Sequence, residues 1–142
     1  MPSAKRTITI KRPAADVFAY VANGLNGPTW RPGVLDIALV SGDGVGAIYR
    51  QGVRGPMGRR IAADYEVTAF EPNRRLEFKA IAGPVRPTGG YLLEETADGT
   101  AVTFWLDEPL AGWKRFVFGR PVQQTMNAEM AALDRLKAVL ER

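Results

Sequence analysis

The sequence predicts an α+β fold in which an antiparallel sheet of seven strands wraps around one long C-terminal helix. Three patterns predict it: a strand-like and then a helical pattern over residues 5–24, strands separated by turns over 34–107, and helical periodicity over 122–142. A helix with one apolar stripe packs across the concave face of such a sheet, which tends to leave a cavity. We therefore expect residues 1–142 to form a single ligand-binding domain.

The first 24 residues predict a strand followed by a helix. Residues 5–12 alternate between polar and apolar side chains, as a half-buried strand does. Pro13 suits the first turn of a helix, which should end near residues 23–24. Its apolar positions follow helical spacing: Ala14, Val17, Phe18 and Val21. A short helix or turn is expected between Asn26 and Trp30.

Turns rich in Gly, Pro, Asn and Asp divide the middle of the chain into strands at 34–41, 46–54, 60–70, 75–82, 86–95 and 101–107. Period-two alternation then selects the side chains that face the helix. The expected inward set is Ala47, Tyr49, Gln51, Val53, Ile61, Ala63, Tyr65, Val67, Ala69, Leu76, Phe78, Ala80, Ala82, Tyr91, Leu93, Val102, Phe104 and Leu106. Its alanines cannot fill the space under a helix, so we expect a cavity of about 300 Å³ or more.

The C-terminal helix carries one acidic residue on its apolar face. At about 100° per residue, one arc holds the apolar stripe Val122, Met126, Met130, Leu133, Leu136 and Leu140, and Glu129 lies inside it. A buried carboxylate must be paired with a base, hydrogen-bonded to a phenol, or protonated. The alternative is a rotated helix that leaves Glu129 solvated at the rim. Lys137 shares the arc but is long enough to reach solvent.

Residues 112–118 combine aromatic and basic side chains in the sequence GWKRFVF. Three interpretations are open: a mobile lid over the cavity, a membrane contact, or the first turns of the last helix with the aromatic side chains buried. We favour the buried turns, followed by an interruption at residues 119–121, where a glycine and a proline occur.

The composition excludes several kinds of chemistry. The chain has no Cys and no His, which rules out disulfides, thiolate nucleophiles, Ser-His-Asp triads and His-based metal sites. We expect no metal and no cofactor, and any enzyme chemistry must use Asp, Glu, Tyr, Lys or Arg. No apolar run approaches the ~20 residues of a membrane span, and the first residues lack the apolar core of an export signal. We expect a cytoplasmic protein without integral membrane association.

The chain has a net charge of +4, and most of its positive charges are arginines. A dense group lies at Arg50, Arg54, Arg59 and Arg60, followed by Arg74 and Arg75. A nucleic-acid-binding protein usually adds interspersed aromatic residues or a recognition helix, and neither is evident, so no nucleic-acid partner is expected. The patch is either a solvated strand edge, which we favour, or a rim that attracts an anionic ligand.

Nine residues are the candidates for ligand contact on these faces: Trp30, Tyr49, Gln51, Tyr65, Phe78, Tyr91, Phe104, Met126 and Glu129. The three phenols are suited to hydrogen-bond a ligand or to stabilise an enolate, although ordinary sheet tyrosines fit the same pattern. Trp30 either caps one end of the cavity or packs between helix and sheet.

Several segments in a fixed order resemble a known superfamily. They are residues 10–18 (IKRPAADVF), 30–34 (WRPGV), 45–46 (VG), 67–72 (VTAFEP) with 75–76 (RL), 99–103 (GTAVT) and 136–137 (LK) before 140–141 (LE). The chain resembles the START-like (SRPBCC) superfamily and, within it, polyketide cyclase/dehydrase-type proteins. The resemblance implies the helix-grip fold with a hydrophobic cavity. It implies no single activity, because function lies in the site that each member places on the fold.

Three functions remain open at this stage. The first is binding of a hydrophobic small molecule such as a lipid, polyketide or aromatic metabolite. The second is a cyclase, aromatase or dehydratase that uses Tyr or carboxylate groups for acid–base chemistry. The third is a protein-interaction module, with Trp105 on the outer face in a homodimer or partner surface. A polar group on the apolar face, within reach of a ligand, favours the second, and a flat apolar patch outside with a filled interior favours the third.

Overall fold

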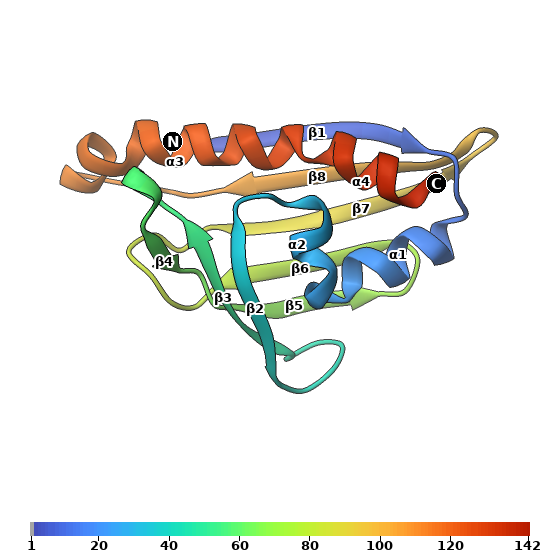
Figure 1. The fold of residues 1–142 in the computed structure, drawn as a ribbon, viewed down its shortest axis with the longest axis horizontal. Coiled ribbons are helices and arrows are strands. Elements are labelled where there is room, and N and C mark those ends of the chain that lie inside the picture. Colours follow the sequence, from blue (N-terminus) through green and yellow to red (C-terminus); the bar gives the residue numbers. More distant parts are fainter. Residues whose placement is uncertain (1) are drawn as a thin grey trace.

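A curved antiparallel sheet and a long C-terminal helical segment form the two layers of the computed structural model, which describes residues 2–142 (Figure 1). The first half contains β1 (Ser3–Ile10), α1 (Ala14–Ala22), the 3-10 turn η1 (Gly24–Asn26), α2 (Gly27–Trp30), β2 (Val34–Ser41), β3 (Ile48–Arg54), the turn η2 (Pro56–Gly58) and β4 (Arg60–Ala62). The second half contains β5 (Tyr65–Glu71), β6 (Arg75–Ala80), β7 (Thr88–Thr96), β8 (Gly99–Asp107), α3 (Trp113–Ala131) and α4 (Leu133–Leu140).

The sheet order is β1-β8-β7-β6-β5-β3-β2, with β4 paired to β3. The first strand therefore lies beside the last one, in continuous register from Ser3–Asp107 to Ile10–Thr100. In Figure 1, α3 and α4 run along β1, and β2 and β3 cross in front at the other edge of the sheet. The space between these edges is where a ligand pocket can form.

The N-terminal prediction is confirmed. The buried residues of α1 are Ala14, Val17, Phe18 and Val21, the four positions of the predicted apolar stripe. The inward sets of β6 and β8 are confirmed as well, with Leu76 buried and Val102, Phe104 and Leu106 all buried. Ala82 is an exception because β6 ends at Ala80.

The predicted strand 60–70 is wrong in one respect, because it is divided into β4 and β5, which makes eight strands instead of seven. The carboxylate of Asp64 accepts a hydrogen bond from the backbone N–H of Gln51 (3.1 Å). A side chain thus takes the place of a backbone acceptor in the ladder, and the strand kinks there.

A bulge in β5 corrects a second prediction. The register of β5 against β6 shifts between Val67 and Ala69. A bulge adds one residue to its strand and so reverses the alternation beyond it. Phe70 therefore packs against the core in place of the predicted Ala69, with its ring 5.1 Å from that of Phe18 in an edge-to-face arrangement.

The C-terminal helix begins earlier than the predicted residue 122 and passes through Pro121 without a break, so the predicted interruption at 119–121 is wrong. Pro121 has no N–H for the carbonyl of Val117, but Val117 is exposed, so water can satisfy that carbonyl. The helix is interrupted instead at Ala132, between α3 and α4.

Basic side chains from β1 and the turn after it fix the rotation of the C-terminal helix. Arg6 donates to the carbonyl oxygen of Met130 (3.1 Å), and Arg12 donates to that of Leu140 (2.6 Å). Lys137 reaches outward, as expected, and its ammonium group donates to the carbonyl oxygen of Thr9 (2.8 Å). With the helix held in this way, Glu129 faces the interior.

No helix within residues 2–142 is long and apolar enough to span a bilayer.

Candidate functional site

A pocket of about 220 Å³, here called the main pocket, lies between the concave face of the sheet and α3. It is smaller than the predicted volume of about 300 Å³. The predicted alanines contribute as Ala63 and Ala80, which line its wall. The other apolar lining residues include Val53, Ile61, Phe78, Phe104, Leu106, Val122 and Met126. Lining residues that are exposed to solvent mark its opening, and these are Arg54, Ala62, Pro84, Pro121 and Thr125.

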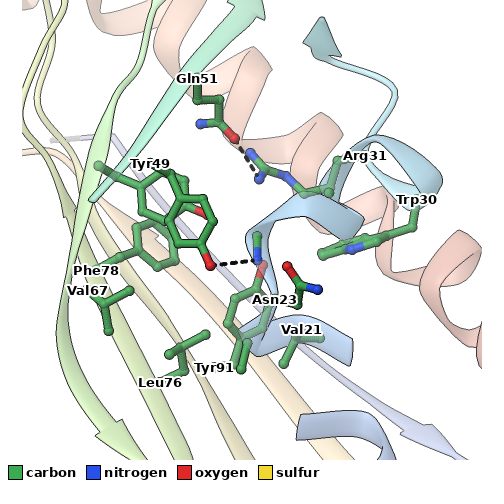
Figure 2. Close-up of a pocket in the computed structure, with 14 residues that line it drawn as sticks. Val21, Asn23, Trp30, Arg31, Tyr49, Gln51, Val67, Leu76, Phe78 and Tyr91 are labelled. Carbon is green, nitrogen blue, oxygen red and sulfur yellow. Dashed lines mark hydrogen bonds between the residues drawn. The ribbon is translucent and has the colours of Figure 1, made fainter. Parts of the chain in front are cut away.

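A second, smaller pocket of about 50 Å³, here called the side pocket, lies under α1 and α2. Figure 2 shows its walls, which are formed by residues of α1, the α2 region and the sheet, among them Val21, Asn23, Tyr49, Val67, Leu76 and Tyr91. Four residues line both pockets: Arg31, Gln51, Tyr65 and Phe78. These four form the partition between the two spaces.

Arg31 of the partition forms a buried ion pair with Glu129, which lines the main pocket. The Nε of Arg31 donates to Oε2 of Glu129 (2.6 Å), and its Nη2 donates to Oε1 (3.2 Å), a two-pronged arrangement that suits the planar guanidinium group. Only 17% of the Arg31 side chain and 11% of the Glu129 side chain are exposed. Burial acts to lower the pKa of Arg31, but the charge of Glu129 and the hydrogen bonds to it outweigh that effect and raise the pKa. Arg31 therefore stays charged.

Gln51 completes the partition and is itself held in place. Its side-chain oxygen accepts from Nη1 of Arg31 (3.2 Å), as Figure 2 shows, and its amide nitrogen donates to the carbonyl oxygen of Ala63 (3.2 Å). Its backbone carbonyl accepts from the N–H of Ala63 (2.8 Å). The kink between β4 and β5 thus wraps around Gln51 and directs its oxygen at Arg31.

The local sequence explains why Arg31 points inward. It follows the short helix α2, and its backbone N–H bonds to the carbonyl oxygen of Gly27 (2.8 Å). Pro32 disfavours a helical backbone at the preceding residue, and Arg31 is accordingly extended (φ −106°, ψ 96°). The chain therefore turns at Arg31, and the side chain extends toward Gln51 and the C-terminal helix (Figure 2).

Aromatic rings form the wall on the other side of the pair. Tyr91 stacks on Phe104 with ring centres 4.5 Å apart, and the Trp30 ring meets both edge-on at 6.3 Å and 6.2 Å. Tyr49 stacks on Tyr65 at 5.1 Å, and its hydroxyl accepts from the backbone N–H of Gly24 (3.3 Å). Trp30 is only 2% exposed and lines the side pocket, so both roles considered for it, packing and closing one end of a cavity, fit the structure.

Two of the phenols are protonated at neutral pH. Burial raises the pKa of Tyr65, although the charge of Arg31 acts in the opposite direction. Burial also raises the pKa of Tyr91, against the same opposing effect of Arg31. Both hydroxyls can therefore donate hydrogen bonds, and neither is a base near neutrality.

All nine sequence-predicted site residues line one or both pockets. Glu129 is buried and paired with a base, the first of the three states that we expected for it. The contribution of the nine residues to ligand binding stays a prediction. The sequence reasoning missed Arg31, although the predicted need of Glu129 for a base and the Arg-Pro step after Trp30 were both available as signals.

The aromatic segment 112–118 is exposed, so the prediction of buried aromatic side chains is wrong there. Trp113 is 66% exposed and Phe116 is 93% exposed, while Phe118 is half-buried and lines the main pocket. The first turn of α3 therefore extends from the opening of the pocket into solvent.

The predicted basic patch is not one continuous surface of free cations. Arg60 pairs with Asp36 (2.8 Å), and both Arg74 and Arg75 pair with Glu71. Arg54 lies at the opening of the main pocket. The favoured interpretation as a solvated strand edge thus fits the paired residues, and Arg54 belongs to the rim.

Solved structures with the same fold cover nearly the whole chain. The protein TTHA0849 from Thermus thermophilus shares 17% identity, with a TM-score of 0.81, over 98% of this chain and 97% of that one. The Zhui aromatase/cyclase from a Streptomyces species shares 14% identity, with a TM-score of 0.76, over 99% and 93%. The di-domain aromatase/cyclase StfQ of the steffimycin biosynthetic pathway shares 12% identity, with a TM-score of 0.81, over 98% and 50%. The TM-scores and the coverage establish the helix-grip fold, and at these low sequence identities they establish nothing finer.

No curated protein sequence matches this chain. The family model for polyketide cyclase/dehydrase and lipid transport proteins matches residues 1–141. That match extends over the whole of the two-layer fold and both pockets. The chain is therefore a member of the polyketide cyclase/dehydrase and lipid transport family.

Proposed function

We propose that the protein binds a compact, neutral, hydrophobic molecule that carries an oxygen acceptor. The observation that supports this proposal best is the apolar main pocket with the ion pair of Arg31 and Glu129 at its inner end. A volume of about 220 Å³ is below the usual range for drug-sized ligands, so a compact ring system or short chain fits better than an extended one.

The oxygen acceptor follows from the hydrogen bonds of Arg31. A guanidinium group has five N–H donors, and three of them have partners within residues 2–142, namely Glu129 twice and Gln51 once. Two donors remain, on a residue that lines both pockets. A carbonyl or hydroxyl oxygen of the ligand would satisfy them, and a purely hydrocarbon ligand would leave them unpaired.

Neutrality follows from the charge balance of the pair. The charge of Arg31 is already compensated by Glu129 at 2.6 Å, so the inner end of the pocket has no net charge to offer an anion. An anionic ligand would have to displace Glu129 and leave that carboxylate buried without a partner, which is costly.

Prodan, a neutral naphthyl ketone whose emission reports its surroundings, provides the binding test. We expect saturable binding with a blue shift, and at least about ten-fold weaker binding in Ala80→Phe, because the new ring occupies the space that the ligand needs. Ala101→Phe is the matched control, since Ala101 lies on the opposite face of β8 from Val102 and lines neither pocket. Equal prodan affinity in both variants would contradict the proposal. If the anionic probe anilinonaphthalene sulfonate bound more tightly than prodan, the proposal that the ligand is neutral would be refuted.

A cyclase- or dehydratase-type enzyme is the second candidate, and one observation favours it. Tyr65 and Tyr91 keep their protons beside the free N–H donors of Arg31, an arrangement suited to stabilise an enolate oxygen. Because the pKa of each phenol is raised, turnover should be independent of pH around neutrality and should fall only above the ordinary phenol pKa of about 10. Tyr65→Phe and Tyr91→Phe should each reduce kcat. An activity limb near pH 6.5, or unchanged turnover in both variants, would eliminate this mechanism.

The interaction-module alternative has less support. Its expected signature is a flat apolar patch on the outside together with a filled interior, and the interior contains the main pocket. Trp105 is half-buried on the outer face of β8.

A further inference from the structure

Four exposed apolar side chains lie on two segments that flank the opening of the main pocket. They are Met57, Trp113, Phe116 and Val117, here called the mouth patch. Met57 is 97% exposed and Phe116 is 93% exposed, the two highest values among the large hydrophobic residues of the described chain. The backbone of Met57 has a positive φ of 59°, which residues other than glycine rarely adopt. The conformation of the turn therefore does not favour a methionine at this exposed position.

The mouth patch is continuous with the pocket. Met57 sits in the turn after Arg54 and Gly55, and both of these residues line the pocket. The Trp113 ring lies 6.2 Å from the ring of Phe118, which also lines the pocket. In Figure 1 the turn between β3 and β4, the loop between β6 and β7 and the start of α3 all lie at the left end of the molecule.

The segments around the mouth patch are mainly basic, although Asp107 and Glu108 directly precede the loop that leads into α3. The three segments that surround the opening carry no acidic residue at 51–63, 80–93 or 109–128. Their exposed cations without an ion-pair partner among residues 2–142 are Arg54, Arg59, Arg86, Lys114, Arg115 and Arg120. Apolar side chains surrounded by cations suit a surface with negative charge outside and an apolar layer beneath it.

We propose that the mouth patch docks on an anionic phospholipid membrane, with the opening of the pocket facing the lipid. Aromatic and aliphatic side chains would enter the boundary between headgroups and acyl chains, while the six cations contact the headgroups. A second copy of the chain is a poorer occupant, because two identical basic rims would face each other. A nucleic acid offers the negative charge but no apolar layer for Met57 and Val117. Docking does not depend on the proposed ligand, although a ligand that partitions into lipid could then enter the pocket without crossing water.

Vesicle co-sedimentation tests the proposal, with phosphatidylcholine vesicles and vesicles of mixed phosphatidylcholine and phosphatidylglycerol. We expect binding to the mixed vesicles that weakens as salt is added, and little binding to phosphatidylcholine alone. The double variant Met57→Gly/Phe116→Ser should bind the mixed vesicles at least about ten-fold more weakly, because it loses two apolar side chains that would be buried in the lipid. Its fold should be unaffected, because both side chains are exposed and glycine tolerates the positive φ. Val40→Ser is the matched control, at an exposed residue of β2 that lines neither pocket.

Tryptophan emission gives an independent readout. Trp113 is largely exposed, whereas Trp30 is buried and Trp105 is half-buried. The mixed vesicles should therefore shift the emission to the blue in the wild type and not in Trp113→Phe. Three results would each overturn the proposal: equal binding to both kinds of vesicle, wild-type binding by the double variant, or tighter binding to an oligonucleotide than to the mixed vesicles. Self-association that the double variant abolishes would assign the patch to a second copy instead.

Discussion

Replacing Arg31 by Met is expected to lower the free energy of unfolding by about 3–5 kcal/mol. Glu129 is 9% exposed, and its carboxylate would be left without a base in a mainly apolar wall. Most of this loss of stability would come from the carboxylate that has lost its partner, since methionine fills most of the volume of arginine. Urea unfolding measures this loss of stability as a lower midpoint concentration of urea with an unchanged m-value.

The double variant Arg31→Met/Glu129→Met separates this cost from a simple loss of contacts. With both charges removed, no unpaired charge is left in the partition, and most of the lost stability should return, even though the side-chain oxygen of Gln51 loses its donor. Arg60→Met is the matched control at the solvated pair with Asp36, where little change is expected because both side chains are about half exposed. If the double variant is as unstable as the sum of the two single variants, the buried-charge explanation fails.

The position of Glu129 could be predicted because helix geometry is local. Its place within the apolar arc follows from spacing along one element, and no partner needs to be known. Its partner could not be predicted in the same way. Arg31 lies 98 positions away, at the end of a short helix with too few residues to show a period. The pairing depends on how the whole chain folds, so the sequence can indicate that Glu129 needs a base and that Arg31 is a candidate, but spacing alone does not pair the two.

The inward faces of the strands were predicted from alternation, and the errors occur where the alternation is broken. Asp64 takes over a backbone hydrogen bond and divides one strand into two, and the bulge between Val67 and Ala69 brings Phe70 inward. Both are specific responses of the backbone to neighbouring strands. A period-two pattern assumes an uninterrupted ladder, so it carries no information about either event.

The start of α3 shows a different limit. Apolar side chains at residues 113–117 suggest burial, but burial requires an opposing surface, and here the helix extends past the sheet into solvent. The sequence specifies the helix and its apolar residues. Only the lengths and positions of the surrounding elements determine what those residues contact.

Replacing Phe104 by Ala should also be costly, by about 3–5 kcal/mol, and this loss should be reversible by a ligand. Phe104 is 1% exposed, stacks on Tyr91 and meets Trp30, so its removal deletes the centre of the aromatic wall. Because Phe104 lines the main pocket, the vacated space joins a cavity that already exists and already opens to solvent. A small aromatic molecule such as indole can then take the place of the missing ring.

Leu136→Ala is the matched control for this rescue. Leu136 is fully buried and lines neither pocket, so its removal costs a comparable 2–5 kcal/mol but leaves a closed hole too small for indole. Indole should raise the thermal midpoint of Phe104→Ala progressively with concentration, as binding to the folded state alone requires, and should leave Leu136→Ala unchanged. Equal stabilisation of both variants by indole would mean that its binding site is elsewhere. The contrast between two equally buried residues therefore tests directly whether the main pocket accepts an aromatic ligand.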